Sequence, residues 1–417
     1  MSLKTSDPQK EVDQFFGDKR IEQHLQNIAK NASLSKPNFR VSRAVKAGNN
    51  FVGDVYRTVI EGEKDGKIER FYAILKCAPT DPRRRLFMKI RKVFLREIYF
   101  YETILSVFDD VLRDYDMSVE YFPMLYGASK EDENEVLVLE DLKSKGYLMR
   151  DTKFLDYQHA RLALRKLGRF HAYSFATRAK KPETFEMFKS LEEPLFVVQN
   201  PPNNEMHDRL VILCNVIRKA LADEEDHYQK RFDHFANNMM DIMAETVKGS
   251  NAEPYAVVNH GDAWTNNILF KYKENEGSSE PQDLRFLDFQ LCRYASPAAD
   301  ISYTLFCSST YKMRLEHYDE LLREYYDSLS TCLRKLDCDP DVLFPYEVLL
   351  DHMERFGKYA AGMAVFVIHI FTDQNNEVVE ISTNINAESY HERLQKDDFY
   401  RNMLKETYKE FVDRNIL

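Results

Sequence analysis

The pattern of apolar residues changes once along this 417-residue chain, near residues 140–142. Before that point, two alternating strands are predicted within residues 51–78, a helix over 88–108, and then two more strands. Beyond it, the spacing of apolar residues is mainly helical. We therefore predict an α+β fold with two lobes: a small antiparallel-sheet lobe with one main helix, residues 1–139, and a larger, mainly helical lobe, residues 140–417.

Composition and charge exclude several classes of protein. A net charge of -10 argues against a general nucleic-acid binder, because such proteins present a basic face. The apolar run over residues 359–371 is interrupted by His369 and is shorter than a membrane helix, so no stable membrane insertion is expected. The N-terminus lacks the apolar segment of a secretory signal, and the six cysteines form no C-x-x-C pair. We expect a cytoplasmic protein with reduced thiols.

One local exception to the acidic character is the segment "PRRRLFMKIRK", residues 82–92. The simpler interpretation is a solvated loop that runs into a helix. The alternative is a patch that faces a phosphate or another anion.

A lysine and a glutamate in the first lobe form a candidate pair. Lys76 lies in the apolar strand "FYAILKCAP", and Glu97 lies in the helix that follows. Taken singly, each is most simply a surface residue. Taken together, they match a Lys–Glu pair that holds a lysine against the phosphates of a nucleotide.

The segment "VVNHGDAWTNNILF", residues 257–270, is either a turn between two strands or a catalytic loop. Asp262 and Asn267 are five positions apart, which is the spacing of the aspartate and asparagine in kinase catalytic loops. The carboxylate would accept the proton of an attacking hydroxyl, and the amide oxygen would bind Mg²⁺. His260 would brace the loop, and Asn266 would belong to the loop structure.

A second predicted metal ligand, Asp288, ends the strand "RFLDFQ", where its position matches the aspartate of a D-F-G motif. Its carboxylate and the amide oxygen of Asn267 are hard ligands of the kind that Mg²⁺ prefers. The segment from Asp288 to Asp300 is too short for the peptide platform of a protein kinase, and no A-P-E element follows. The sequence therefore favours a small-molecule kinase.

Several motifs together resemble one family. The strings "HGDAWTNNILF", "LDFQ", "VLVLEDL", "GRFHA" and "FLREIYFY" are similar to those of the ecdysteroid kinase-like family, a CHK kinase-like group related to choline kinase and aminoglycoside phosphotransferases. The resemblance implies a bilobal, protein-kinase-like fold with ATP in a cleft. It also implies phosphorylation of a hydroxyl on a lipophilic small molecule, such as an ecdysteroid or a xenobiotic.

The resemblance also implies roles for individual residues. Lys76 would hold the ATP phosphates and Glu97 would pair with it, while Asp262 would be the catalytic base beside the Mg²⁺ ligands Asn267 and Asp288. Asp300 would brace the loop. A turn that covers the phosphates would be formed by Gly48, Asn49 and Asn50. A connector that binds the adenine would be formed by Glu140, Asp141 and Leu142. The turn departs from the family pattern at Val52-Gly53-Asp54, where a serine is usual.

Two alternative functions remain open at this point. One is a kinase whose acceptor is choline, ethanolamine or an aminoglycoside, and the other is a pseudokinase that binds a nucleotide without turnover. Trp264, the single tryptophan, is either a packing residue that anchors the loop or an aromatic wall for the acceptor. The aromatic residues between 303 and 371 are expected in the core, although some of them would suit a lipophilic acceptor site.

Overall fold

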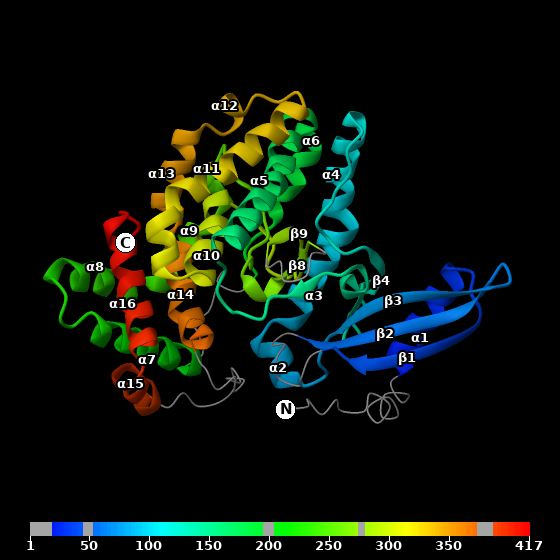
Figure 1. Ribbon diagram of the computed structural model, residues 1–417, viewed down its shortest axis with the longest axis horizontal. Coiled ribbons are helices and arrows are strands. Elements are labelled where there is room, and N and C mark those ends of the chain that lie inside the picture. Colours follow the sequence, from blue (N-terminus) through cyan, green and yellow to red (C-terminus); the bar gives the residue numbers. More distant parts are fainter. Residues whose placement is uncertain (1–18, 45–52, 195–203, 274–279, 373–386) are drawn as a thin grey trace. The chain divides into compact units, whose positions relative to one another are not determined.

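The computed structural model describes residues 19–44, 53–194, 204–273, 280–372 and 387–417 (Figure 1). Its contacts divide the chain into two compact units. The first unit comprises Met1–Glu102 and Phe122–Leu148, and the second comprises Thr103–Tyr121 and Met149–Leu417. The architecture confirms the predicted α+β class, with a small antiparallel sheet followed by a mainly helical part. The lobe boundary between residues 139 and 140 stays a prediction.

A five-stranded antiparallel sheet forms the centre of the first unit, in the order β1-β2-β3-β5-β4. A tight turn joins β2 to β3 through Asp65 and Gly66, which both have positive φ angles, 51° and 74°. Two such residues give the mirror-image turn that suits the twist of a tight hairpin. The strands are β1 (Ser35–Arg43), β2 (Asp54–Lys64), β3 (Lys67–Cys77), β4 (Leu125–Ser129) and β5 (Val136–Glu140).

Strand β1 was not expected from the sequence, which predicted four strands in this unit. Its sequence "SKPNFRVSR" is polar and contains Pro37, which removes a backbone donor. Proline is tolerated where a strand lies at the edge of a sheet or at a bulge. Both conditions hold, because β1 is an edge strand and its register with β2 shifts between Ser35 and Asn38.

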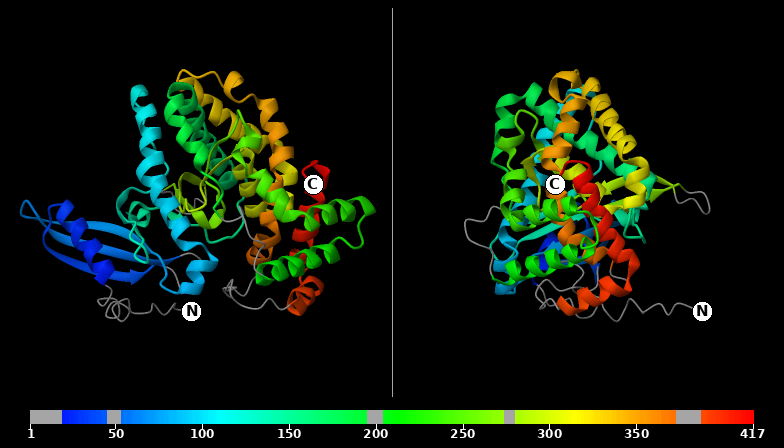
Figure 2. Two further views of the ribbon diagram at one scale, coloured as in Figure 1. Left: turned by 180° about the vertical axis from the view of Figure 1, so that it is seen from behind. Right: turned by 90° about the vertical axis from the view of Figure 1, so that its left-hand side faces the viewer.

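Helix α1 (Lys19–Asn31) packs on one face of this sheet (Figure 2). Its apolar side chains Ile21, Leu25 and Ile28 join a buried core with residues of the strands, including Leu75 and Cys77. Because neighbouring strand residues point to opposite faces, Lys76 is directed away from this core. The remaining helical elements of the unit are α2 (Pro82–Phe87), α3 (Ile90–Tyr99) and the 3-10 turn η4 (Leu142–Lys145).

The helix predicted over residues 88–108 is divided into three pieces. Helix α3 passes through a wider π-helical turn, η2 (Phe100–Ile104), into α4 (Leu105–Leu112) and the 3-10 turn η3 (Arg113–Tyr115). A π turn inserts an extra residue and so changes which side chains share a face.

Helices make up most of the second unit, and α5 lies along α11 (Figure 1). A Cβ atom at Gly168 of α5 would lie 2.4 Å from the carbonyl oxygen of Tyr325 in α11, so the absence of a side chain permits this close approach. The helices are α5 (Tyr157–Lys180), α6 (Pro182–Phe185), η5 (Glu186–Ser190), α7 (Asn204–Ala220), α8 (Asp226–Asn237), α9 (Met239–Thr246), η6 (Gly249–Ala252), α10 (Pro297–Ser308), α11 (Tyr311–Lys335), α12 (Pro340–Leu343), α13 (Tyr346–Phe356), α14 (Lys358–Phe371), α15 (Ala387–Lys396) and α16 (Asp398–Asp413).

Short strands hold the segment that was predicted to be a catalytic loop. Strand β7 (Val257–Asn259) pairs with β10 (Arg293–Ala295), and β8 (Ile268–Tyr272) pairs with β9 (Pro281–Phe286). The short strand β6 is Leu148–Met149, and the 3-10 turn η7 (Thr265–Asn267) leads into β8. Residues 260–267 therefore connect two strands of different sheets.

The six cysteines are all free and buried. Across the residues that the structure describes, no helix is both long enough and apolar enough to cross a membrane.

Candidate active site

The predicted lysine–glutamate pair is formed within the first unit. Lys76 leaves the face of β3 opposite the α1 core, and its Nζ donates a hydrogen bond of 2.6 Å to Oε2 of Glu97 on α3. The two side chains are 7% and 1% exposed. Burial of two charges is costly unless they are paired, so this contact fixes both residues firmly. The pair supplies a preorganised ammonium group on the sheet.

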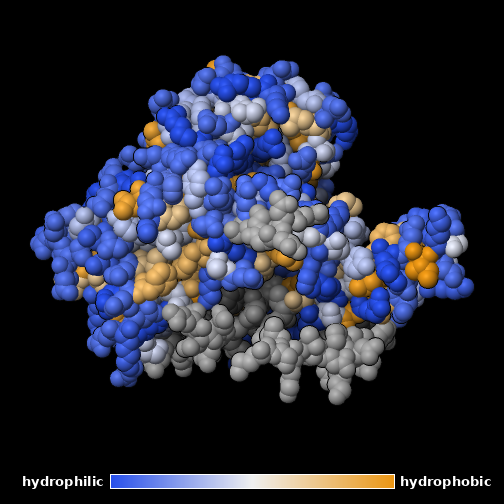
Figure 3. Space-filling model, in the orientation of Figure 1, coloured by the Kyte–Doolittle hydropathy of each residue, from blue (hydrophilic) through white to orange (hydrophobic). Residues whose placement is uncertain are grey.

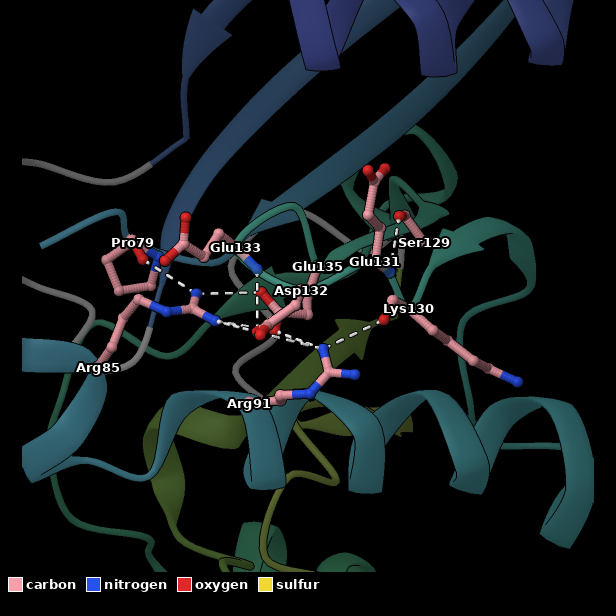
Figure 4. Close-up of polar contacts among 9 residues, drawn as sticks. All are labelled: Pro79, Arg85, Arg91, Ser129, Lys130, Glu131, Asp132, Glu133 and Glu135. Carbon is pink, nitrogen blue, oxygen red and sulfur yellow. Dashed lines mark hydrogen bonds and ion pairs between the residues drawn. The ribbon is translucent and has the colours of Figure 1, made fainter. Parts of the chain in front are cut away.

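A cluster of charges holds α2 and α3 against the loop before β5 (Figure 4). Arg85 of α2 makes a two-pronged contact with the fully buried carboxylate of Glu135, at 2.9 and 3.0 Å, and Arg91 of α3 donates to the same carboxylate at 3.1 Å. Both arginines also contact Asp132. These two members of the basic segment are therefore structural, and they help to fix the helix that carries Glu97.

The predicted nucleotide contacts of the first unit are only partly described. Gly48, Asn49 and Asn50 lie outside the described residues. Gly53, just beyond them, runs so close to β3 that a Cβ atom would lie 2.9 Å from the carbonyl oxygen of Cys77. The end of the predicted phosphate-covering turn thus lies beside Lys76.

The predicted adenine connector is held by ion pairs. Asp141 accepts a 2.5 Å hydrogen bond from Nε of Arg57, and its other oxygen caps the turn η4 through the backbone of Lys143. Glu140 pairs with Lys145, and Leu142 is buried. The acidic side chains therefore order the connector, and contact of Glu140, Asp141 and Leu142 with a nucleotide stays a prediction.

In the second unit, the carboxylate of Asp300 binds the backbone at the start of the loop formed by residues 260–267. The two oxygens of Asp300, in the first turn of α10, accept hydrogen bonds from the backbone amides of His260 and Gly261, at 2.6 and 2.9 Å. His171 contacts the same carboxylate at 3.2 Å. Burial acts to raise the pKa of Asp300, but the hydrogen bond from His171 and the charges around it outweigh burial, so the pKa lies below its usual value. Asp300 is thus a charged brace.

Helix α10 contacts the loop at regular intervals. The hydroxyl of Thr304 donates to the carbonyl oxygen of Ala263 at 2.7 Å, and the hydroxyl of Ser308 accepts from the amide of Thr265 at 3.1 Å. Together with Asp300 these residues are spaced by four, so they share one face of the helix. One helical face therefore fixes successive backbone groups of the loop.

Gly261 allows the loop to turn. Its φ angle is 87°, and a Cβ atom would lie 2.0 Å from the carbonyl oxygen of Leu291. Only glycine combines this conformation with this lack of space. Its carbonyl oxygen accepts hydrogen bonds from Nη2 of the buried Arg293 at 2.7 Å and from the hydroxyl of Tyr359 at 3.0 Å.

Asp262 lies at the centre of this arrangement, and both of its carboxylate oxygens have a donor. Oδ1 accepts from the hydroxyl of Tyr303 at 2.9 Å, and Oδ2 accepts from Nδ2 of Asn267 at 2.9 Å. Burial, followed by the charge of Asp288, raises the pKa of Asp262 to about 7, although the two hydrogen bonds oppose this shift. The carboxylate is therefore held in one orientation.

The side-chain hydrogen bond described for His260 lies within the loop itself, as a bracing residue requires, and the role of this residue stays a prediction. It is fully buried, and its Nδ1 accepts a hydrogen bond of 3.2 Å from the amide of Asp262. Burial lowers its pKa to about 4, so the ring is neutral at pH 7. The ring lies against Phe289, with centroids 4.2 Å apart.

The two predicted metal ligands are brought together by the backbone. The amide of Leu287 donates to the carbonyl oxygen of Asn267 at 2.9 Å, which places Asp288, the next residue, beside the loop. Asp288 has a φ angle of 67°, an uncommon conformation for a residue other than glycine. Such conformations are held by their surroundings and often occur at functional sites.

A comparison with protein families identifies the group. The model of the ecdysteroid kinase-like family matches residues 47–338, which is more than half of the chain and includes the lysine–glutamate pair and the whole loop. The chain belongs to the ecdysteroid kinase-like family. It is therefore a small-molecule phosphotransferase, and membership of a kinase-like family implies nucleotide binding.

Comparisons with individual proteins add little to the family assignment. A search of curated proteins gave no match. Among solved structures, this ecdysteroid kinase-like chain is similar to the GDP complex of wild-type aminoglycoside 2'-phosphotransferase-IIIa, at 12% identity and a TM-score of 0.38, over 96% of this chain and 99% of that one. A mutant of that enzyme, also with GDP, gives 10% identity and a TM-score of 0.40, over 95% and 98% of the two chains.

Several residues that hold the loop of this ecdysteroid kinase-like protein were missed in the sequence. They are His171, Arg293, Tyr303, Thr304 and Tyr359. The spacing by four of Asp300, Thr304 and Ser308 was a readable signal, because three small polar residues on one face of an apolar helix need partners. Arg293 and Tyr359 lie far along the chain from the loop, and no local pattern marks them.

Proposed function

We propose that the chain transfers the γ-phosphate of ATP to a hydroxyl group of a lipophilic small molecule, an ecdysteroid or a related hydroxylated metabolite or xenobiotic. The observation that carries this proposal is the carboxylate of Asp262, held by Tyr303 and Asn267 in a loop whose backbone is fixed by α10. Phosphoryl transfer requires mainly positioning and electrostatic stabilisation, and an oriented base supplies the first of these.

In the proposed reaction, the acceptor oxygen forms a bond to the γ-phosphorus, and the bond from that phosphorus to the bridging oxygen breaks. The electron pair leaves with ADP, and the hydroxyl proton passes to Asp262. Tyr303 and Asn267 keep the carboxylate aimed at that proton. Lys76, fixed by Glu97, binds the phosphates of ATP and neutralises part of their charge.

The amide oxygen of Asn267 and the carboxylate of Asp288 suit Mg²⁺ as ligands. This ion neutralises phosphate charge when it is bound with ATP. Asp288 raises the pKa of Asp262, so the site contains two neighbouring carboxylates whose charge a divalent cation would offset. Nδ2 of Asn267 faces Asp262, which turns its Oδ1 away from that carboxylate. No group of three or more His, Cys, Asp or Glu side chains forms a metal site within the described ranges. Two ligands are enough, because Mg²⁺ usually keeps waters and substrate phosphates in its shell.

The test is turnover of ATP with Mg²⁺ and a panel of ecdysteroids, with choline as a cationic alternative. Asp262→Asn should lower kcat by about 10²–10⁴-fold, the usual contribution of a positioned base, and leave the affinity for ATP unchanged. Asn266→Ala, an exposed residue of the same loop, is the matched control and should retain turnover.

Normal turnover in the Asp262→Asn variant would exclude Asp262 as the base. A thermal shift with ATP and Mg²⁺, but no phosphate transfer to any alcohol in the panel, would indicate a pseudokinase instead.

A further inference from the structure

A buried arginine contacts the loop of residues 260–267 from β10. Hydrophilic side chains cover most of the face shown in Figure 3, whereas Arg293 is 0% exposed. Its strand pairs with β7, where Asn259, the residue before the loop, lies opposite it. Its Nη2 donates to the carbonyl oxygen of Gly261 at 2.7 Å, and the next residue is the candidate base Asp262. Arg293 is therefore joined to the backbone on which the base depends.

Two neighbouring side chains keep the guanidinium group charged and in place. Its central carbon lies 4.2 Å from the ring centroid of Tyr359, which is a cation–π distance. Its Nη1 lies 3.7 Å from Oε1 of Glu193, whose side chain is 0% exposed. Burial acts to lower the pKa of Arg293, but its interactions with Tyr359, Glu193 and Asp300 outweigh burial and raise this pKa. A positive charge is therefore held in the interior beside the loop.

The loop uses only part of what this arginine could donate. Nε and Nη1 of Arg293 have no hydrogen-bond partner among the residues that the structure describes. The segment that carries Glu193 is held next to β10, because the amide of Tyr294 donates to the carbonyl oxygen of Leu191 at 2.7 Å. Glu193 still remains beyond hydrogen-bond distance of Nη1. Arg293 therefore supplies the loop with one donor and one charge.

Stability alone does not account for a charge at this position. Taking an arginine and a glutamate out of water is costly, and apolar residues of similar volume often serve as well or better. The 3.7 Å contact between Arg293 and Glu193 recovers less of this cost than a close, hydrogen-bonded pair would. A charged donor does, however, make a stronger hydrogen bond than a neutral one. The benefit of the charge is therefore to be found at the carbonyl oxygen of Gly261.

We propose that Arg293 is a positioning residue of the transfer reaction, because its charged Nη2 fixes the carbonyl oxygen of Gly261 and, through it, the backbone of Asp262. Glu193 keeps the guanidinium group from turning away from the loop. This role rests on the proposed kinase function, in which Asp262 is the base. Arg293 touches no reacting atom, so it affects the rate of transfer without contributing to the binding of ATP.

The test exchanges the ion pair for an apolar pair, so that no buried charge is left alone. Arg293→Met/Glu193→Leu should lower kcat by about 10²-fold, the effect of a small misplacement of a reacting group, and leave the KM for ATP unchanged. Arg293→Lys keeps the charge and one donor. It should keep kcat within about tenfold of the wild type, because the loop uses a single N–H group of this side chain.

A second buried pair of the same unit provides the matched control. Arg314 and Glu410 are 0% and 4% exposed and lie 2.8 Å apart. The other hydrogen bonds described for Arg314 go to Ser309 and Thr407, neither of which lies within residues 260–267. Arg314→Met/Glu410→Leu should leave both kcat and KM unchanged. Equal losses of kcat in the two double variants would overturn the proposal, as would a loss in Arg293→Lys as large as in the Arg293 double variant.

Trp264 provides a second measurement, which needs no substrate. It is the only tryptophan, and it lies in the same loop, stacked on Phe371 with centroids 5.1 Å apart. Acrylamide should quench its fluorescence more strongly in the Arg293 double variant than in the wild type, and equally in the Arg314 double variant and the wild type. Unchanged quenching in the Arg293 double variant would overturn the positioning role. If the wild type phosphorylates no alcohol of the panel, the proposed function fails, and the quenching comparison still decides whether Arg293 positions the loop.

Discussion

The two units position their candidate functional residues by different means. In the first unit, the ammonium group of Lys76 is held by a charge–charge contact with Glu97, in a buried setting. In the second unit, Asp262 is held by neutral donors, and the backbone around it is fixed by several side chains of α10. Removing one partner of a buried ion pair costs a large part of the folding free energy, because the other charge stays buried. Removing one member of a hydrogen-bond network costs the free energy of a single contact.

This difference predicts which substitutions destabilise each unit most. Within the network, Asp300 is the exception, because a single charged residue accepts from two backbone amides and contacts His171. We therefore expect the largest losses at Asp300 and at Glu97, and small losses at the neutral hydroxyl groups.

The largest effect is expected for Asp300→Ala. It leaves three buried donors without an acceptor, and each such donor costs about 1–3 kcal/mol. Unfolding in denaturant, followed by Trp264 fluorescence, measures the free energy of the second unit. Ser302→Ala is the control, because the hydroxyl of Ser302 contacts only the carbonyl oxygen of Ala299 among the hydrogen bonds described for it. Equal free energies of unfolding for the two variants would contradict the bracing role.

The next effect is expected for Glu97→Ala, which leaves the Lys76 ammonium group buried without its carboxylate. Such a change costs about 3–5 kcal/mol. Hydrogen exchange of the β3 amides should speed up accordingly. In the double variant Lys76→Met/Glu97→Leu, exchange should return toward the wild-type rate while turnover stays lost, because an apolar pair replaces the ion pair. An unchanged exchange rate in Glu97→Ala would show that the pair does not support the sheet.

Acid should destabilise the second unit before the first. Burial, with the charge of Arg393, lowers the pKa of His369 to about 3, and burial lowers that of His352 to about 4. The unfolded chain binds a proton at each site near pH 6.5, so stability is lost as pH falls from about 6.5 toward these folded values, by about 2 kcal/mol per histidine at pH 5. The first unit contains one histidine, His24.

The measurement for acid stability is the free energy of unfolding between pH 7 and pH 5, followed by Trp264 fluorescence. In His369→Asn, which cannot gain a proton, the loss over this range should be smaller than in the wild type. The same loss in both proteins would remove His369 from the explanation.

The smallest effect is expected for Thr304→Val, which keeps the shape of the side chain and removes one neutral hydrogen bond to Ala263. The free energy of unfolding should fall by about 0.5–1.5 kcal/mol, and kcat should change little, because Asp300 and Ser308 still hold the loop. A loss as large as that of Asp300→Ala would show that the network is not redundant.

The candidate catalytic residues could be predicted from the sequence better than the residues that position them. Lys76, Glu97, Asp262 and Asn267 stand in an order and spacing that phosphoryl transfer requires, and the structure brings Lys76 to Glu97 and Asn267 to Asp262. Their roles in the reaction stay predictions. Arg293 and Tyr359 could not be found, because their contact with Gly261 exists only after folding.

Fold prediction failed where local signals were weak. The helices and the β2–β3 turn were readable from periodicity and from the pair Asp65-Gly66. Strand β1 was missed because an edge strand with a proline and exposed side chains lacks the alternation of a half-buried strand. The basic segment was undecided because Glu135 and Asp132, which bind Arg85 and Arg91, lie more than 40 residues further along the chain.

Asp300, Thr304 and Ser308 share one face of α10, so their contacts with the loop depend on the number of residues between them. Each added or deleted residue rotates everything beyond it by about 100° around the helix axis. A deletion between Asp300 and Thr304 would therefore swing both hydroxyl groups away from Ala263 and Thr265 at once, although every residue type would remain present. A point substitution removes one of these contacts at a time. An insertion or deletion within this helix would instead remove all the contacts beyond it together.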